Sequence, residues 1–337
     1  MAGSEERKRF WDTLLNLRDG GSDSCSKLLA AIPRVSKVCR FRTVNESSLD
    51  QLQSNRLLFS SADHYDDPFD TYFYINYDAI KKALATLQAA YSKGGVNALR
   101  PLLNERGFGL RKDGLLNMVL EHIDCDPPNI SLFERQFGSL RSQIMKDSYS
   151  ICFCDDPMNE SLWLKYADNH RGFVQIYDLD DSGVVRCGTS RECVNCLFGS
   201  NPPTLYPVYY SDDRYDATRF AITELLLNNL PCEMTSAYPT FAGMLSNSVV
   251  WEMERISLIK KECHEYDGEW RMICPSYPKT RPGIAMKPSS IAVGLRMPEY
   301  ERRLVVSAAI VAGISDIFEM YINRDDQLAM RPVSAIG

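Results

Sequence analysis

The alternation of hydrophobic and polar residues predicts helix and strand in turn along the N-terminal part of the chain. Phe10, Trp11 and Leu14 recur at helical spacing on one apolar face, and a Gly-Gly pair should end this amphipathic helix. The stretch "SKVCRFRTV" then alternates like a strand, "NESSLDQLQSN" carries helix caps, and "RLLFSSA" predicts a second strand. Residues 35–61 are therefore expected to fold as strand, short helix and strand.

A helical insertion should interrupt the sheet that these strands begin. Helical patterns recur between residues 78 and 147, at "DAIKKALATLQAAY", "GLLNMVLEHI" and "ISLFERQFGSLRSQIM". Strand patterns return at "YSICFC", "GFVQIYDL" and "LYPVYY", and helices are expected around 214–230 and 245–262. The chain then predicts a strand at "SIAVGL", a helix at 298–312 and a strand at "DIFEMYI".

These patterns together predict an α+β protein with a split sheet, mixed or antiparallel. A chain of 337 residues that is 45% hydrophobic can bury the core of such a protein without disulfides or metals. We expect an N-terminal helical extension at 1–34 and a single domain at 35–325 that carries the insertion at about 75–147. Residues 326–337 are expected to form a C-terminal tail.

Composition and charge narrow the range of partners. A net charge of −6 and a pI near 5.4 argue against bulk electrostatic binding of nucleic acid or of an anionic membrane, although they allow a local basic patch. The N-terminus has no apolar signal region, and the longest apolar run, "VVSAAIVAGI", has about half the length of a membrane span. We expect a cytoplasmic protein without a membrane partner, whose 11 cysteines are reduced.

The stretch from 150 to 181 combines a strand with a short helix. Alternate residues of a strand share a face, so Cys152 and Cys154 should point the same way. Asp-Pro should begin the following helix, on which Trp163, Tyr166 and His170 form one stripe. This stripe either stacks on a planar ligand or is a buried amphipathic face. A cysteine hydrolase would instead pair Cys154 with His170.

Two other clusters raise the question of metal binding. Cys187, Cys193 and Cys196 contain a Cys-x-x-Cys pair, but a zinc site needs four ligands and only Cys232 and His170 are further candidates, so a loop with incidental thiols is favoured. The acidic loop "DHYDDPFD" could bind a divalent cation, although it lacks the calcium-loop pattern and Asx turns at Asp-Pro explain it better. We predict no metal. The acidic residues of this loop are Asp63, Asp66, Asp67 and Asp70.

The stretch "EYDGEWRMI" places acids at the start of an apolar strand. Glu269 and Arg271 should share one face of the strand, with Trp270 and Met272 on the other. One interpretation is an ion pair across an exposed sheet face. The other is a carboxylate that stabilises developing positive charge or orients a ribose hydroxyl. Spacing alone favours the ion pair.

Five motifs occur in an order that resembles a widespread bacterial and phage domain family of unknown function. They are "CRFR", "LFSSADHYDDPFD", "CFC", "WLKYADNHRG" and "DGEWR", and the resemblance spans about residues 38–325. Two positions depart from the family pattern. Cys154 stands where the family has a serine, and Asp267 where it has a glutamate.

The same motifs resemble, more remotely, the Arg-Ser-Glu class of ADP-ribosyltransferases. The resemblance implies that Arg42, or less well Arg40, binds the pyrophosphate of NAD, that an aromatic ring such as Tyr166 stacks on the nicotinamide, and that Glu269 stabilises the oxocarbenium-like transition state. Asp267 would position the acceptor or water. The predicted catalytic residues are Glu269, Asp267 and Arg271, and those predicted to bind NAD are Arg42, Arg40, Ser150, Cys152, Cys154, Trp163, Tyr166, His170 and Asp67.

The resemblance therefore predicts an NAD-consuming enzyme. It would transfer ADP-ribose to a macromolecule, either protein or nucleic acid, or hydrolyse NAD, in a toxin or anti-phage role. Two alternatives remain: a non-catalytic sensor module that binds its ligand through the aromatic stripe and the acidic loop, and the cysteine hydrolase. The transferase requires Arg42, the 150–154 strand and Glu269 to meet at one cavity.

Overall fold

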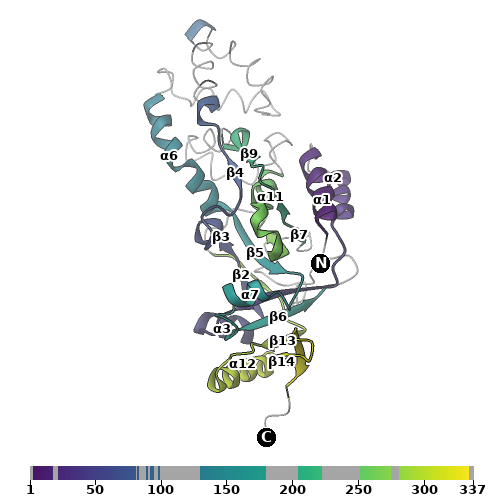
Figure 1. Cartoon of the computed structure of the whole chain (residues 1–337). Coiled ribbons are helices and arrows are strands. Elements are labelled where there is room, and N and C mark those ends of the chain that lie inside the picture. The colour runs from purple at the N-terminus through teal and green to yellow at the C-terminus, as the bar shows by residue number, and fades with distance from the viewer. Residues whose placement is uncertain are drawn as a thin grey trace.

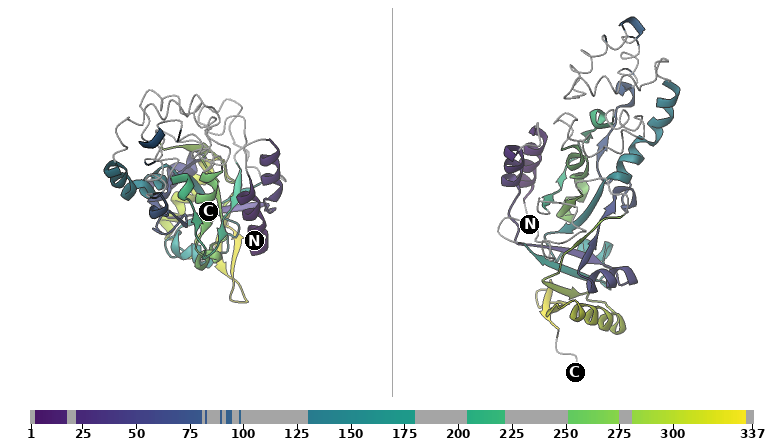
Figure 2. Two further views of the ribbon diagram at one scale, coloured as in Figure 1. Left: turned by 90° about the horizontal axis from the view of Figure 1, so that it is seen from above. Right: turned by 180° about the vertical axis from the view of Figure 1, so that it is seen from behind.

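The computed structural model describes residues 3–17, 22–80, 130–179, 204–221, 251–274 and 281–333, together with 82, 89, 92–94 and 98. A long sheet runs through the centre of the molecule (Figure 1). The helix α12 (Glu299–Val311) lies at one end, the helix α6 (Ile130–Asp147) lies at the other, and α1 (Ser4–Asn16) and α2 (Ser22–Ala31) lie along one side. The view from behind shows the same arrangement (Figure 2).

The central sheet is mixed. Among the described residues it has nine strands in the order β15-β14-β13-β6-β1-β5-β11-β7, and β3 pairs with β5 outside this path. All pairs are antiparallel except β13 with β14, which α12 connects. The strands are β1 (Lys37–Arg42), β3 (Ser60–Ser61), β5 (Tyr149–Cys154), β6 (Phe173–Asp178), β7 (Leu205–Pro207), β11 (Glu269–Ile273), β13 (Ser290–Val293), β14 (Asp316–Ile322) and β15 (Leu328–Pro332).

Short strand pairs and helices surround this sheet. The pairs are β2 (Arg56–Leu58) with β12 (Gly283–Ala285), β4 (Phe73–Tyr74) with β9 (Tyr215–Asp216), and β8 (Tyr209–Tyr210) with β10 (Ile259–Lys260). Further helices among the described residues are α3 (Glu46–Gln53), α7 (Glu160–Lys165) and α11 (Glu252–Ser257), with 3-10 turns at η1 (Ala62–His64) and η3 (Glu262–Asp267). The protein thus has a mixed α+β fold, as predicted.

The apolar face of β11 forms part of the core. Trp270 and Met272 are fully buried and pack in one cluster with Ile151 and Phe153 of β5. Their neighbours Glu269 and Arg271 point to the opposite face of the strand, as the alternation predicts. The core therefore holds β11 in the register that its polar face needs.

The predicted elements are found where their patterns are strongest. The order strand, short helix, strand holds at β1, α3 and β2, and the strands β5, β6, β13 and β14 and the helix α12 lie at their predicted places. The helix expected at 245–262 was too long, because α11 ends at Ser257 and β10 follows. The segment predicted as a tail contributes β15, which pairs with β14 at the sheet edge.

Some predictions lie outside the described residues. These include most of the helical insertion and the helix expected at 214–230 beyond its first turn. They also include the four cysteines that were considered as zinc ligands, Cys187, Cys193, Cys196 and Cys232. Within the described part of the chain, no helix has the length and apolar character that crossing a membrane requires.

Candidate functional site

A polar cavity opens where three neighbouring strands meet. The strands β1, β5 and β11 lie side by side, and Cys39, Cys154 and Glu269 face one another across them. The cavity has a volume of about 270 Å³, and the acidic loop, Tyr166 and Lys260 complete its wall. We call it the polar cavity. The predicted residues that line it are Arg40, Arg42, Asp67, Ser150, Cys152, Cys154, Tyr166, Asp267 and Glu269.

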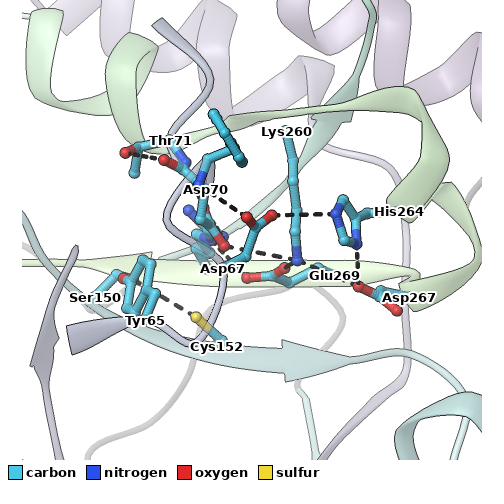
Figure 3. A network of polar contacts seen from close by, with 12 residues as sticks. Tyr65, Asp67, Asp70, Thr71, Ser150, Cys152, Lys260, His264, Asp267 and Glu269 are labelled. Carbon is cyan, nitrogen blue, oxygen red and sulfur yellow. Dashed lines mark hydrogen bonds and ion pairs between the residues drawn. The ribbon is translucent and has the colours of Figure 1, made fainter. Parts of the chain in front are cut away.

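Two buried cations bind the carboxylate of Glu269. Its Oε1 accepts a hydrogen bond of 2.6 Å from Arg271 Nε, and its Oε2 lies 3.0 Å from Lys260 Nζ. Glu269 is 7% exposed and Arg271 is 0% exposed, so the pair does not lie on an exposed sheet face as the simpler interpretation supposed. Figure 3 shows Lys260 reaching down to Glu269 between the acidic loop and η3.

The acidic loop supplies the second carboxylate of this network. Both oxygens of Asp70 accept hydrogen bonds from Arg271 Nη2, at 2.7 and 2.8 Å, and Oδ2 lies 3.6 Å from Lys260 Nζ. Arg271 also donates to the backbone oxygen of Ser257. Arg271, which was predicted to be catalytic, is therefore not among the residues that line the cavity. Its side chain joins β11 to the acidic loop.

The charge of Glu269 is fixed by its neighbours. Burial by itself would raise the pKa of Glu269, but the charges of Arg271 and Lys260 and the hydrogen bond from Arg271 hold that pKa well below its usual value. Burial likewise opposes the charge of Lys260, whereas Glu269 and Asp70 raise the pKa of this amine above its usual value. Both groups are ionised at neutral pH, and the carboxylate is held in one orientation.

Asp267 lies at the same end of the cavity and is 3% exposed. Its carboxylate binds Lys165 Nζ at 3.1 Å and Lys260 Nζ at 3.2 Å. His264 lies between Asp267 and Asp67, at 3.6 and 3.1 Å. This end of the cavity is therefore a closed set of paired charges.

The Asx turn expected in the acidic loop is present, because the backbone N–H of Phe69 donates to Asp67 Oδ1 at 2.8 Å. Within the described residues, no group of His, Cys, Asp or Glu could hold a metal ion.

Two guanidinium groups also line the cavity. Arg40 and Arg42 of β1 are half-buried and form no salt bridge with a carboxylate in the described part of the chain, and Arg40 Nη1 has no hydrogen-bond partner there. Burial and the neighbouring charge of Arg40 lower the pKa of Arg42. Arg281, whose charge also acts on both guanidinium groups, donates to the oxygen of Phe59. Guanidinium groups that are partly removed from water and have no carboxylate partner among the described residues suit an anion.

The middle of the cavity is formed by hydroxyl and thiol groups. Tyr65 and Ser150 share a short hydrogen bond through their hydroxyls, and Cys152 Sγ lies 3.8 Å from Ser150 Oγ. Burial, followed by the charge of Glu269, raises the pKa of Cys152 to about 12. Cys152 is therefore a neutral thiol at physiological pH and not a nucleophile.

The predicted stripe of Trp163, Tyr166 and His170 does not exist as one surface. The helix α7 ends at Lys165, and residues 168–170 all have positive φ values between 47° and 67°, so the chain leaves helical geometry. Trp163 is fully buried and stacks on the ring of His170 at 5.8 Å. Only Tyr166, which is 39% exposed, reaches the polar cavity.

The catalytic pair of the cysteine hydrolase is also absent. Cys154 Sγ accepts the N–H of Asp156 at 3.3 Å, and the ring of His170 is occupied by its stack on Trp163. No hydrogen bond joins Cys154 to a histidine among the described residues. Asp155, the acid next to Cys154, accepts hydrogen bonds from Trp270 Nε1 and Arg7 Nη2.

The turn before β11 requires its glycine. Gly268 has φ of +56°, the left-handed region that side chains disfavour, and an added Cβ would lie 2.9 Å from Asp155 Oδ1. The turn lets Asp267 and Glu269 approach the same amine of Lys260. Glu265, by contrast, is exposed at the loop surface.

Sequence reasoning missed several residues of this site. Asp70 had been noticed only as part of the acidic loop, and Tyr65 stands in the same loop without a signal of its own. Lys260 lies in a segment that was expected to be helical, and no sequence pattern marks this lysine as a site residue. Burial distinguishes Asp70 and Lys260, and a place in the cavity wall distinguishes Tyr65; only the folded chain shows either.

Comparison with known proteins adds no relative. No family model matches the sequence, no curated protein matches it, and no solved structure matches the fold.

Proposed function

We propose that this protein is an NAD-consuming enzyme of the ADP-ribosyltransferase type, which transfers ADP-ribose to a macromolecule or hydrolyses NAD. One observation carries the proposal. Arg42, the strand β5 and Glu269, which come from three adjacent strands, line the same cavity. This is the convergence that the resemblance to the Arg-Ser-Glu class requires.

The distribution of charge along the cavity suits NAD as a substrate. The pyrophosphate would bind the uncompensated guanidinium groups of Arg42 and Arg40, since planar donors bind phosphate through paired hydrogen bonds. Tyr166, on the cavity wall, offers a ring on which the nicotinamide can stack. The substrate would then extend from these two guanidinium groups toward Glu269.

At Glu269 the reaction is cleavage of the bond between ribose C1′ and the nicotinamide nitrogen. The bonding electron pair leaves with nicotinamide, and the ionised carboxylate stabilises the positive charge that develops on the ribose. An acceptor group or water then attacks C1′ and gives up its proton. Lys260 and Arg271 keep the carboxylate ionised and oriented.

The experiment is release of nicotinamide from NAD by the wild type and by Glu269→Gln. The variant should lose turnover by about a hundredfold or more. Glu265→Gln is a matched control, because Glu265 lies in η3 just before β11 and is exposed, and this variant should turn over NAD like the wild type. Equal turnover in Glu269→Gln and wild type, with both folded, would overturn the proposal.

A non-catalytic binding module is a second candidate, and a specific observation favours it. Both oxygens of Glu269 are engaged by protein cations, an arrangement that also serves to stabilise a fold. Such a module would bind an anion at Arg42 but release no nicotinamide. Calorimetric binding of NAD without turnover would support this candidate against the enzyme.

A further inference from the structure

A second cavity shares the acidic loop with the polar cavity. It has a volume of about 250 Å³ and brings together residues 68–77, one side chain of α6 and one that precedes β9. We call it the aromatic cavity. Its chemistry is set by Phe69, Tyr72, Tyr74, Tyr77, Arg141 and Arg214.

The fold builds this cavity from segments that are distant in sequence. The strand β4 pairs in parallel with β9, which places Arg214 beside the loop that leads into β4. Arg141 Nη1 donates to the oxygen of Phe73 at 2.7 Å, and its guanidinium lies 4.2 Å from the centre of the Phe73 ring. The guanidinium of Arg214 lies 4.8 Å from the centre of the Tyr72 ring. Each cation is thus fixed over an aromatic face.

The two cations have no counter-charge among the described residues. Of these residues, no carboxylate lines the cavity, and none forms a salt bridge with Arg141 or Arg214. Burial lowers the pKa of Arg141, and the like charge of Arg214, which lines the same cavity, lowers it further. Asp216, which follows Arg214 by two residues, accepts a hydrogen bond from the hydroxyl of Tyr74 at 3.0 Å. An anion placed between the cations would relieve the repulsion.

The aromatic rings are open to a ligand as well. Phe69 is 61% exposed and Tyr74 is 37% exposed, although both are large apolar groups that folding usually covers. A ligand that matches the cavity therefore has a planar ring and a negative charge next to each other. Each nucleotide of a single strand has both, and proteins bind single strands through aromatic stacking and cationic side chains.

We propose that the aromatic cavity binds one nucleotide unit, with the base on the exposed rings and the phosphate between Arg141 and Arg214. An acidic peptide would satisfy the cations but leave the rings exposed. The overall charge of −6 disfavours a long polyanion, so recognition is confined to a single unit, either a free nucleotide or one nucleotide of a short single strand.

The position of the aromatic cavity relates it to the proposed reaction. Asp67 and Asp70 line the polar cavity, whereas Pro68 and Phe69, between them in sequence, line the aromatic cavity. A bound nucleotide would therefore stand next to the site of NAD cleavage. Its use as the acceptor of ADP-ribose rests on the proposed function, whereas its binding does not.

The test is fluorescence anisotropy with a labelled short oligothymidylate, with thymidine monophosphate, thymidine and inorganic phosphate as competitors. Arg214→Ala and Phe69→Ala should each weaken binding by about five- to a hundredfold. Arg303→Ala and Tyr300→Ala are the matched controls, because both residues are exposed on α12 at the other end of the molecule, and they should bind like the wild type.

The competitors identify the source of the nucleotide. If thymidine monophosphate displaces the oligonucleotide with an affinity equal to that of the oligonucleotide itself, the ligand is a free nucleotide. If it competes much more weakly, the ligand is one nucleotide of a strand. Both results support the inference. Competition by inorganic phosphate as strong as by the monophosphate, or unchanged binding in Arg214→Ala, would overturn it. So would stronger binding of a polyglutamate peptide than of the oligonucleotide.

The outcome is separable from that of the proposed function. Oligonucleotide binding that depends on Arg214, without nicotinamide release from NAD, would contradict the proposed enzyme function but not the nucleotide site. Nicotinamide release that depends on Glu269, without oligonucleotide or nucleotide binding, would contradict only the nucleotide site.

Discussion

Glu269 divides its two oxygens between Arg271 and Lys260, and Asp70 binds the same two cations from the other side. A buried carboxylate in such a network has little freedom to turn, and it stays ionised because the cations outweigh the cost of burial. The arrangement serves stability and, in the proposed reaction, places a fixed negative charge beside the ribose. Mutations at Glu269 therefore have to be judged by stability and turnover together.

Glu269→Gln should lower the free energy of unfolding by about 3–5 kcal/mol, because it leaves the buried cations Arg271 and Lys260 without one of their partners. Urea unfolding at neutral pH measures the change. The exposed acid Glu265 provides the control, and Glu265→Gln should stay within about 0.5 kcal/mol of the wild type. A Glu269→Gln variant as stable as the wild type would show that the network does not stabilise the fold.

Arg42→Met should reduce the affinity for NAD without reducing the stability of the fold. Arg42 has no carboxylate partner among the described residues, and its lowered pKa reflects burial and the neighbouring Arg40, so its removal should leave the free energy of unfolding unchanged or slightly higher. Affinity for NAD, measured by calorimetry, should fall by about tenfold or more with the loss of charge-assisted hydrogen bonds. A destabilised variant with unchanged NAD affinity would assign Arg42 a structural role only.

At the scale of elements, the N-terminal helix α1 supports the strand that carries Glu269. Arg7 is 3% exposed and lies near the rings of Tyr210 and Trp270. Its Nη1 donates to the backbone oxygens of Val208 and Glu269, at 2.9 and 2.7 Å. The start of β11 is therefore held from outside the sheet by a residue more than two hundred positions earlier in the chain.

Arg7→Ala should destabilise the protein by about 3 kcal/mol, because it leaves two buried carbonyl oxygens and the carboxylate of Asp155 without this donor. Arg7→Lys should recover part of the loss, since the charge remains but the fork of donors does not. Arg9 is exposed on the same helix, and Arg9→Ala is the matched control in thermal and urea unfolding. Equal stability of Arg7→Ala and Arg9→Ala would contradict this account of α1.

At the scale of the whole molecule, the polar cavity is a product of strand order. The strand β1 from the start of the domain lies beside β5, and β5 lies beside β11 from near its end. Residues from 39 to 269 thereby share one space of about 270 Å³. Its lining combines the cations Arg40 and Arg42 of β1 with the carboxylates Glu269 and Asp267.

The free energy of unfolding should fall at acid pH, because Glu269 becomes protonated there. Its pKa is lower in the folded than in the unfolded state, where about 4.3 is usual, so the ionised group stabilises the fold above that value. This contribution should disappear progressively as the pH falls below about 4.3 toward the lowered folded pKa. Urea unfolding from pH 7 to pH 3 should show a steeper loss for the wild type than for Glu269→Gln. Parallel curves would disprove the assignment to this residue.

The prediction of elements from sequence succeeded where a pattern of burial is local. The alternation in β1, β5 and β6 and the helical spacing in α12 are set by which face meets the core, and all four are found. The helical pattern of Trp163, Tyr166 and His170 failed, because the chain leaves helical geometry after Lys165 and turns His170 back onto Trp163. Spacing could not reveal that change of backbone.

The sequence by itself determined the alternation of β11, the glycine turn before it and nine of the residues that line the polar cavity. Only the tertiary structure decided that Glu269 and Arg271 are buried together, that Lys260 and Asp70 enclose them, and that Arg40 and Arg42 have no carboxylate partner among the described residues. The reason is physical. Periodicity records which face of an element avoids water, whereas the pairing of charges depends on which distant elements the fold brings within a few ångströms of one another.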